Sequence, residues 1–288
     1  MGDWVMAQEP VIRLGFLFGV VGIMATLEVW RPRRPLSVSK PYRWINNGGI
    51  VMLDTLLVRV LFPAGAVGLA LYVEAQGWGL FQVLDLPGWL VLLLCVVILD
   101  FIVWAQHVFF HAVPALWRLH RVHHADLDFD LTTGLRFHPL EILLSFALKA
   151  AAIVALGAPA LAVLLFEVIL SSMALFNHSN VRLPEGLDRW LRRFIVTPDF
   201  HRVHHSWHPN ETNANFGFNL SCWDRLLGTY QAQPREGHDD MTIGINQFRE
   251  PEWTRLDKLL VQPFVGPDHS YPINRRPEDA PAHRKDPS

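Results

Sequence analysis

The chain has 288 residues, of which 51% are hydrophobic and only 18% are charged, and its formal net charge is −2. An ordinary soluble domain carries about 25% charged residues, and a net charge near zero gives no basic surface for nucleic acid. The two cysteines, Cys95 and Cys222, form neither a disulfide framework nor a zinc-finger spacing. The composition therefore favours an integral membrane protein with reduced thiols and gives no indication of a nucleic-acid partner.

Four apolar stretches have the composition of membrane-spanning segments, and they cover about residues 11–30, 50–73, 88–104 and 140–176. The first is followed by arginines rather than preceded by them, which indicates an uncleaved anchor. A helix needs about 20 apolar residues to cross a bilayer, so the last stretch is long enough for two passes. Gly157-Ala158-Pro159 in its middle predicts a tight hairpin. We expect an all-α bundle with four or five transmembrane helices.

The distribution of lysine and arginine predicts the orientation of these helices. Basic residues concentrate in residues 31–49, in residues 106–139 and after residue 177, whereas the connection 74–87 contains none. We expect the basic segments to be cytoplasmic, and the 74–87 connection and the 157–159 turn to lie on the other side. This orientation places every histidine motif at the cytoplasmic face, although the histidines were not used to derive it.

Charged residues inside apolar stretches need partners. Lys149 and Glu167 lie nine residues before and nine residues after Ala158. An antiparallel hairpin centred at Ala158 brings both to the same depth, which predicts an ion pair; the alternative is that Lys149 extends to the membrane interface. By similar reasoning we expect Arg59 to reach Asp100.

Eight of the 14 histidines form three spaced motifs. Residues four apart share a helix face, so HxxxH offers two imidazoles to one ion, and each HxxHH unit can point all three imidazoles one way. Charged imidazoles repel one another, whereas a metal binds them in the neutral form. Eight nitrogen donors exceed what one tetrahedral or octahedral ion uses. We therefore predict two metal ions in one pocket, bound by His107, His111, His120, His123, His124, His201, His204 and His205.

Three further residues beside the motifs are candidates for the site. His138 and His178 lie where the chain re-enters and leaves the membrane, and each is either a metal ligand or an interfacial hydrogen-bonding residue. Asp100 lies seven residues before His107 on the same helical stripe. A carboxylate there is placed to accept a hydrogen bond from a ligand imidazole and to fix its tautomer.

An all-nitrogen ligand set without the glutamate of an HExxH motif suits iron that binds dioxygen beside an apolar substrate, while zinc accepts the same ligands. A histidine-rich metal transporter or metal-binding protein is the first alternative, and it would place ligands along a path near the bilayer midplane. A zinc hydrolase is the second, and it would need a carboxylate base among the ligands.

The run from Asp100 to His124, the sequence Asn177-His178-Ser179-Asn180 and the final HxxHH unit closely resemble the fatty acid hydroxylase and sterol desaturase superfamily over about residues 100–230. The resemblance implies a membrane non-haem di-iron enzyme that uses dioxygen and external electrons to hydroxylate or desaturate a C–H bond of a lipid, such as a sterol or fatty acyl chain. It also implies that the eight motif histidines and His178 are ligands. Some members carry another histidine where this chain has Arg182.

The resemblance also sets the expected organisation and partners. Membrane anchor helices occupy residues 1–90, and a catalytic domain of the fatty acid hydroxylase type with a cytoplasmic, histidine-rich helical cap occupies residues 91–266. Residues 267–288 are rich in proline and charge, and we expect a disordered tail there. The chain contains no segment like cytochrome b5, so we expect the electrons to come from a separate protein.

Overall fold

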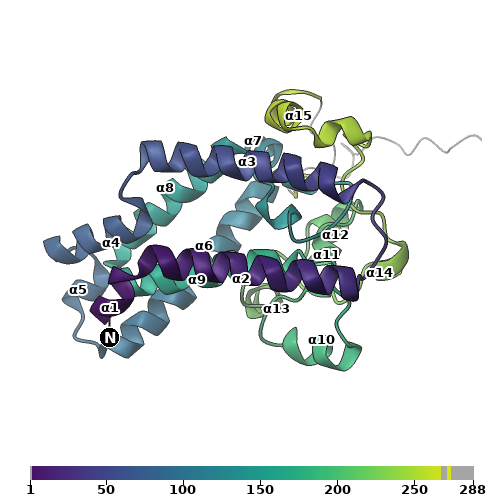
Figure 1. Ribbon diagram of the computed structural model, residues 1–288. Helices are drawn as coiled ribbons and strands as arrows, with labels where there is room; N and C mark the ends of the chain where they lie inside the picture. The colour runs from purple at the N-terminus through teal and green to yellow at the C-terminus, as the bar shows by residue number, and fades with distance from the viewer. Residues whose placement is uncertain (1, 267–270, 274–288) are drawn as a thin grey trace, which may run out of the picture.

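The computed structural model describes residues 2–266 and 271–273, which form a bundle of long helices with a cap of short helices at one end (Figure 1). The described residues contain three isolated β-bridges and no strand. The predicted all-α architecture is confirmed. Most of the predicted tail lies outside the described residues.

Within the described residues, five segments are long and apolar enough to cross a membrane: α2 (Glu9–Trp30), the segment Lys40–Val83, α6 (Gly88–Ala112), α8 (Pro139–Leu156) and α9 (Ala160–Asn177). Large apolar side chains point outward from them; Val29 is 77% exposed and Ile45 is 74% exposed. A broad apolar surface of this kind is stable only where lipid covers it. The protein is therefore an integral membrane protein.

The second and third apolar stretches differ from the sequence-based prediction. The second is divided, because Pro63 follows the end of α3 (Lys40–Leu61) and cannot continue it; α4 (Gly65–Gln76) and α5 (Leu80–Val83) then follow. The third continues past residue 104 to Ala112, since histidines lower the hydropathy of the last turns without ending the helix. His107 and His111 therefore belong to the long helix α6 itself.

The predicted hairpin between α8 and α9 is confirmed. Gly157 adopts a left-handed φ of +64°, and a Cβ at this position would lie 2.4 Å from the carbonyl oxygen of Trp78. The side chain of Gln82 also donates a hydrogen bond to the Gly157 carbonyl oxygen, at 3.2 Å. The connection 74–87 and the 157–159 turn thus meet at one end of the bundle, away from the cap (Figure 1).

One of the two predicted ion pairs is present. Lys149 pairs with Glu167, as expected, and Arg13 from α2 adds a second cation to the same carboxylate. The expected pair between Arg59 and Asp100 is wrong. Asp100 instead accepts a hydrogen bond from the Trp223 indole N–H at 2.8 Å.

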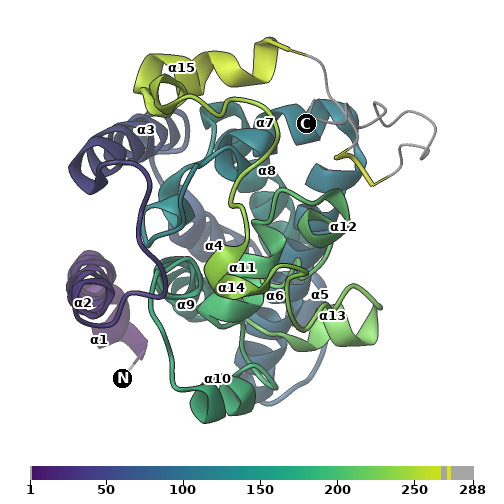
Figure 2. The ribbon, with the colours of Figure 1, turned by 90° about the vertical axis from the view of Figure 1, so that its right-hand side faces the viewer.

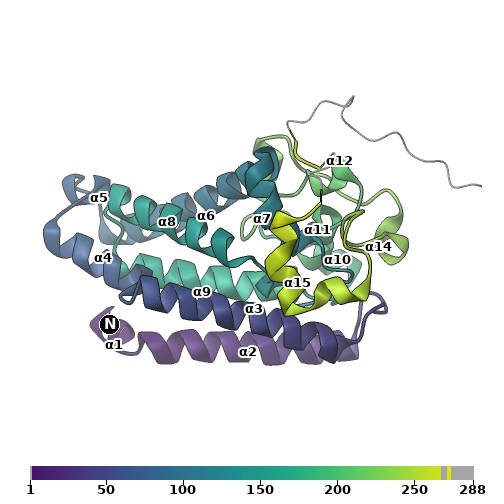
Figure 3. The same cartoon turned by 90° about the horizontal axis from the view of Figure 1, so that it is seen from above.

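The cap contains most of the short helices. Figures 1 and 3 both show it at one end of the long helices, and Figure 2 shows α10, α13 and α15 around its rim. Its elements are α7 (Pro114–His124), η1 (Thr133–Leu135), α10 (Glu185–Leu191), α11 (Pro198–His204), α12 (Pro209–Thr212), α13 (Cys222–Leu226), α14 (Gly237–Asp240), η2 (Pro251–Thr254), α15 (Leu256–Val261) and η3 (Gln262–Phe264). The short helices outside the cap are α5, in the 74–87 connection, and α1 (Gly2–Ala7), which precedes α2.

Part of the predicted disordered tail is fixed against this cap. The Tyr271 ring stacks on Trp117 with 5.5 Å between ring centroids, and its hydroxyl donates a hydrogen bond to the carbonyl oxygen of Trp207 at 2.8 Å. The backbone N–H of Ile273 donates to the carbonyl oxygen of His111 at 3.0 Å. The expectation of disorder is therefore wrong for residues 271–273. The buried side chain of Tyr271 anchors them to the cap, although the sequence around them is polar.

Buried charges connect the first helices to the chain segment that follows α7. Arg43 on α3 donates hydrogen bonds to both carboxylate oxygens of Asp126, at 2.9 and 2.6 Å, and another to Asp130. Burial alone raises the pKa of Asp126, but the guanidinium groups of Arg43 and Arg136 outweigh it and lower this pKa to about 2. Asp126 is therefore ionised at neutral pH, and the segment 125–133 is fixed to α3.

Replacing Arg43 with methionine tests this connection. R43M removes the cation that pairs with Asp130 and one of the two that pair with Asp126, and breaking a buried ion cluster in this way costs about 3–5 kcal/mol. We expect a large fall in the thermal unfolding temperature of the detergent-solubilised protein, measured by circular dichroism. The control is R255M, because Arg255 and its partner Asp257 are 55% and 58% exposed and such pairs contribute little. Equal unfolding temperatures for R43M and R255M would contradict the assignment.

Candidate metal centre

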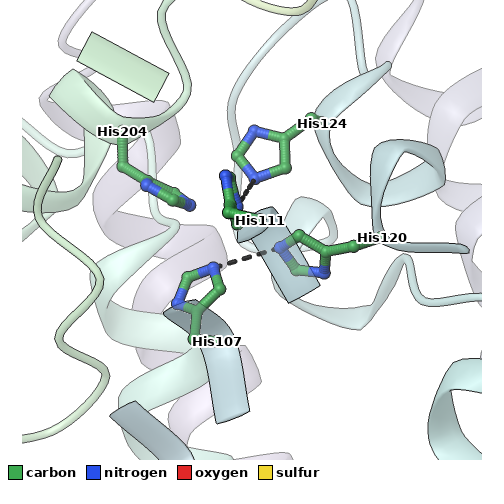
Figure 4. A group of neighbouring side chains, drawn as sticks. All are labelled: His107, His111, His120, His124 and His204. Atoms are coloured by element: carbon green, nitrogen blue, oxygen red, sulfur yellow. Dashed lines mark hydrogen bonds between the residues drawn. The ribbon is translucent and has the colours of Figure 1, made fainter. Parts of the chain in front are cut away.

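Nine buried histidines converge in two groups at the cap end of the bundle. Within each group the candidate ligand nitrogens all lie within 4.8 Å of one another. Figure 4 shows the rings of the first group around a common centre. The first group is His107, His111, His120, His124 and His204, and the second is His123, His178, His201 and His205.

The two HxxHH units divide their histidines between the groups. In α7, His120 and His124 face the first group and His123 faces the second, while in the α11 unit His204 alone faces the first. At 3.6 residues per turn, position i+4 lies about 40° from position i on one side, and position i+3 lies about 60° away on the other. The expectation that each unit points all three imidazoles one way is therefore wrong. Each unit contributes to both groups.

The distances between imidazole nitrogens suit shared metal ions. Nitrogens about 2.1 Å from one ion lie about 3.0 Å apart when the two bonds are at right angles. In addition, Nε2 of His204 and both ring nitrogens of His205 are buried without a hydrogen-bond partner in the described part of the chain. The Nε2–Nε2 distances are 3.0 Å for His107–His120, 3.1 Å for His111–His124, 3.2 Å for His123–His178 and 3.1 Å for His178–His201.

Five of the nine histidines are held in one tautomer. In each, Nδ1–H donates a hydrogen bond to an oxygen atom, so the lone pair of Nε2 points into the group, as is usual for metal-binding histidines. Four acceptors are uncharged oxygens, and the fifth is a carboxylate. The pairs are His107 with the Phe216 carbonyl at 2.8 Å, His111 with Asn213 Oδ1 at 3.1 Å, His120 with Glu141 Oε1 at 2.6 Å, His178 with the Ala174 carbonyl at 2.8 Å, and His204 with the Ala214 carbonyl at 2.8 Å.

The carboxylate beside the histidines is Glu141, which sequence reasoning did not single out, and not Asp100. Asp100 lies seven residues before His107, which is about 10 Å along α6, and there it binds the turn that begins α13: its Oδ2 accepts hydrogen bonds from the backbone N–H of Leu220 and from Trp223. The expected hydrogen bond from an imidazole to Asp100 is therefore wrong. The only sequence signal for Glu141 is its place in the first turn of α8.

His138 and His178, the two additional candidates, have different positions. His178 ends α9 and belongs to the second group. His138 belongs to neither group: its Nδ1 accepts a hydrogen bond from the Leu140 backbone N–H at 3.2 Å, so it caps the start of α8. A ligand role for His138 has no support in this geometry. Arg182 pairs with Asp239 at the surface and does not reach the histidines.

Glycine is required where η1 passes the second group. A Cβ added to Gly134 would lie 2.4 Å from the carbonyl oxygen of Ala174 and 3.0 Å from Nδ1 of His178. These two atoms form the hydrogen bond that orients the His178 ring. A side chain at residue 134 would therefore displace a candidate ligand.

Burial favours the neutral imidazoles that a metal requires. Burial lowers the pKa of the six histidines of the HxxHH units well below the usual value, and neighbouring imidazoles lower it further. For His178 burial lowers the pKa to about 3. These rings are therefore neutral at physiological pH.

A cavity of about 770 Å³ extends from the histidines between the long helices. His107, His120 and His123 line it at the cap end, and residues of α1 and α2 line it at the other. The lining is mainly apolar, and the volume lies in the range of lipid-sized ligands. A long apolar molecule in this cavity would contact members of both histidine groups.

The fold and the site together define a class: a helical membrane protein with a buried, all-histidine site suited to two metal ions beside a lipid-sized cavity. The family model described as Fatty acid hydroxylase matches residues 92–229. This match and the curated relatives support the assignment of these residues to the fatty acid hydroxylase superfamily.

Curated relatives include lipid hydroxylases and monooxygenases. Ornithine lipid hydroxylase OlsE of Rhizobium tropici is 34% identical over 184 residues, which cover 64% of this chain and 53% of that protein. Alkylglycerol monooxygenase of Xenopus tropicalis is 27% identical over 224 residues (75% and 47%), and cholesterol 25-hydroxylase of Mus musculus is 30% identical over 147 residues (49% and 47%). The chain thus spans about half the length of these relatives. No solved structure gives a significant match.

Replacing Glu141 tests whether it orients His120. A carboxylate that accepts from a ligand imidazole typically contributes 10–100-fold to metal affinity, so we expect E141Q to retain metal about tenfold less tightly or worse. Retention is measured by elemental analysis after dialysis against graded concentrations of a chelator. D100N is the control, since Asp100 binds the α13 turn. A larger loss of metal in D100N than in E141Q would contradict the structure.

The metal-free protein should lose stability as the pH falls. An unfolded chain protonates its histidines as the pH drops below about 6.5, whereas the folded protein keeps them neutral because burial lowers their pKa. Their contribution is therefore complete above about pH 6.5 and decreases toward the folded pKa, which is about 3 for His178. Calorimetry should show a falling unfolding temperature between about pH 7 and pH 5. An unfolding temperature that rises over this range would contradict burial of neutral rings.

Proposed function

We propose that this protein is a membrane non-haem di-iron oxygenase that hydroxylates a C–H bond of a lipid. The overall reaction is R–H + O2 + 2 e⁻ + 2 H⁺ → R–OH + H2O, with the electrons delivered by a separate protein. The single observation that carries the proposal is that two adjacent groups of buried histidines border one lipid-sized, mainly apolar cavity.

The two groups offer five and four imidazoles for two ions. Iron fits this donor set, and when bound it supplies dioxygen activation and electron transfer, which no amino-acid side chain provides. Zinc would accept the same nitrogens, but it has no redox chemistry. Glu141 and the backbone carbonyl groups that accept from Nδ1 hold the rings in the binding tautomer.

The chain's own residues would position the substrate. His107, His120 and His123 line the cavity, so a lipid chain that fills it places one of its carbon atoms beside both groups. Phe110 and Phe137 line the same end, and their rings exclude water from the reacting position. Fixed register and a dry site are the two contributions that a protein makes to selective attack on one C–H bond among many.

The relatives favour hydroxylation over desaturation, because each of those cited is named as a hydroxylase or a monooxygenase. The basic residues of the cap favour a cytoplasmic metal site. An electron donor of the cytoplasm would then reach the cap without crossing the membrane. We accordingly propose that donor docking and lipid entry use different faces of the protein.

Alanine variants of the proposed ligands test this function. Loss of a ligand from the first group should abolish the product, so we expect H107A and H204A to lose all measurable activity while remaining in the membrane. The measurement is lipid mass spectrometry of a host supplied with ¹⁸O2, in which the wild type yields a lipid that has gained one ¹⁸O atom. H208A is the control, because His208 pairs with Glu236 outside both groups.

Two results would contradict the proposal. One is an oxygenated lipid at wild-type levels in H107A or H204A. The other is transport of metal ions into vesicles by the purified protein without any lipid product, which would instead favour the metal-transporter alternative.

A further inference from the structure

Asp54 is a buried carboxyl group with no partner. It lies on α3, is only 4% exposed and lines the cavity. Neither of its carboxylate oxygens has a hydrogen-bond partner among the described residues. A carboxyl group in such a place costs several kcal/mol unless a partner satisfies it.

Every other buried acid among the described residues has at least one hydrogen-bond partner, although one oxygen each of Asp100, Glu141 and Glu211 has none. Asp126 accepts from Arg43 and Thr133, Asp128 accepts from two backbone N–H groups, and Glu167 pairs with Lys149 and Arg13. Asp54 differs from these acids because neither of its carboxylate oxygens has a partner among the described residues. An acid kept without a partner in a membrane helix marks a functional position.

The surroundings of Asp54 indicate what would satisfy it. The cavity wall is mainly apolar, and the amide of Gln106, which also lines the cavity, already donates to Ser145 Oγ, at 2.7 Å. The ammonium group of Lys149 is bound by Glu167. Arg59 also lines the cavity, but no donor among the described residues makes a hydrogen bond to either oxygen of Asp54, so we look for the donor in a molecule that enters the cavity.

We propose that Asp54 is a specificity-determining residue that accepts a hydrogen bond from a hydroxyl or amide N–H group of the lipid substrate. This inference rests on the proposed lipid oxygenase function, and it narrows the substrate class. The substrate is an amphiphile that carries a donor group within the part that is buried in the cavity. A hydrocarbon or ether chain without a donor would leave the carboxyl group unsatisfied and would bind less tightly.

The test uses two probes that differ in one donor. Radiolabelled 1-hexadecanol is bound to the full-length protein in detergent and is displaced by unlabelled 1-hexadecanol or by 1-methoxyhexadecane, which keeps the oxygen but lacks the O–H. The wild type should prefer the alcohol by about tenfold, which corresponds to the upper end of the net contribution of one ordinary hydrogen bond. D54L should lose this preference, and D54N, which keeps an acceptor oxygen, should retain part of it.

Two controls separate recognition from folding. T26V changes an exposed threonine of α2 that does not line this cavity and whose hydroxyl donates to the Gly22 carbonyl oxygen, so it should leave the preference unchanged. D54L should unfold at the same temperature as the wild type or higher in the absence of added lipid, because the substitution removes an unsatisfied buried group. A lower unfolding temperature for D54L would contradict the absence of a partner in the folded protein.

The binding assay needs neither reductant nor turnover, so its outcome is independent of the proposed reaction. Equal binding of alcohol and ether by the wild type, or an undiminished preference in D54L, would overturn the role of Asp54 even if the protein hydroxylates lipids. A preference that depends on Asp54, in a protein that forms no oxygenated product, would support this inference and count against the oxygenase function alone.

Discussion

The structure depends on keeping nine closely spaced imidazoles neutral in the buried interior of the cap end. Nitrogens that lie 3.0–3.2 Å apart would repel strongly if the rings were charged, and neutral rings still need something to receive their lone pairs. Two metal ions meet both requirements at once. The helices bring these rings together: α6 and α7 provide five of them, the residue after α9 provides one, and the α11 unit provides three, which are divided between both groups.

Buried charges hold the supporting parts in place. Arg43 joins α3 to the segment after α7 through Asp126, and Glu28 on α2 accepts hydrogen bonds from the backbone N–H groups of Leu131 and Asn180. These contacts fix the chain directly after His124 and directly after His178. The N-terminal helices are therefore more than an anchor, since they fix two segments that carry candidate ligands.

The sequence was sufficient for the helical spans, the 157–159 turn and the Lys149–Glu167 pair, because hydropathy and hairpin symmetry determine them. The sequence was not sufficient where contacts between residues far apart in the chain determine which side chains meet. Asp100 shares a helical stripe with His107, but it is Glu141, from another helix, that accepts the hydrogen bond from His120. Backbone carbonyl groups also orient rings, as that of Ala174 orients His178 four residues later, and such groups leave no signal in the sequence. Pro63 broke an apolar stretch that hydropathy alone joins. The angles between helix positions explain why each HxxHH unit divides its histidines between two groups, but only after the structure has shown that there are two groups.

We propose that the two histidine groups bind two separate ions. The most direct measurement is elemental analysis of iron-loaded, purified protein, comparing the wild type with H124A from the first group and H201A from the second. The account predicts about two iron ions per chain in the wild type and about one in each variant. One ion per chain in the wild type, or complete loss of iron-binding in only one of the two variants, would contradict two independent centres.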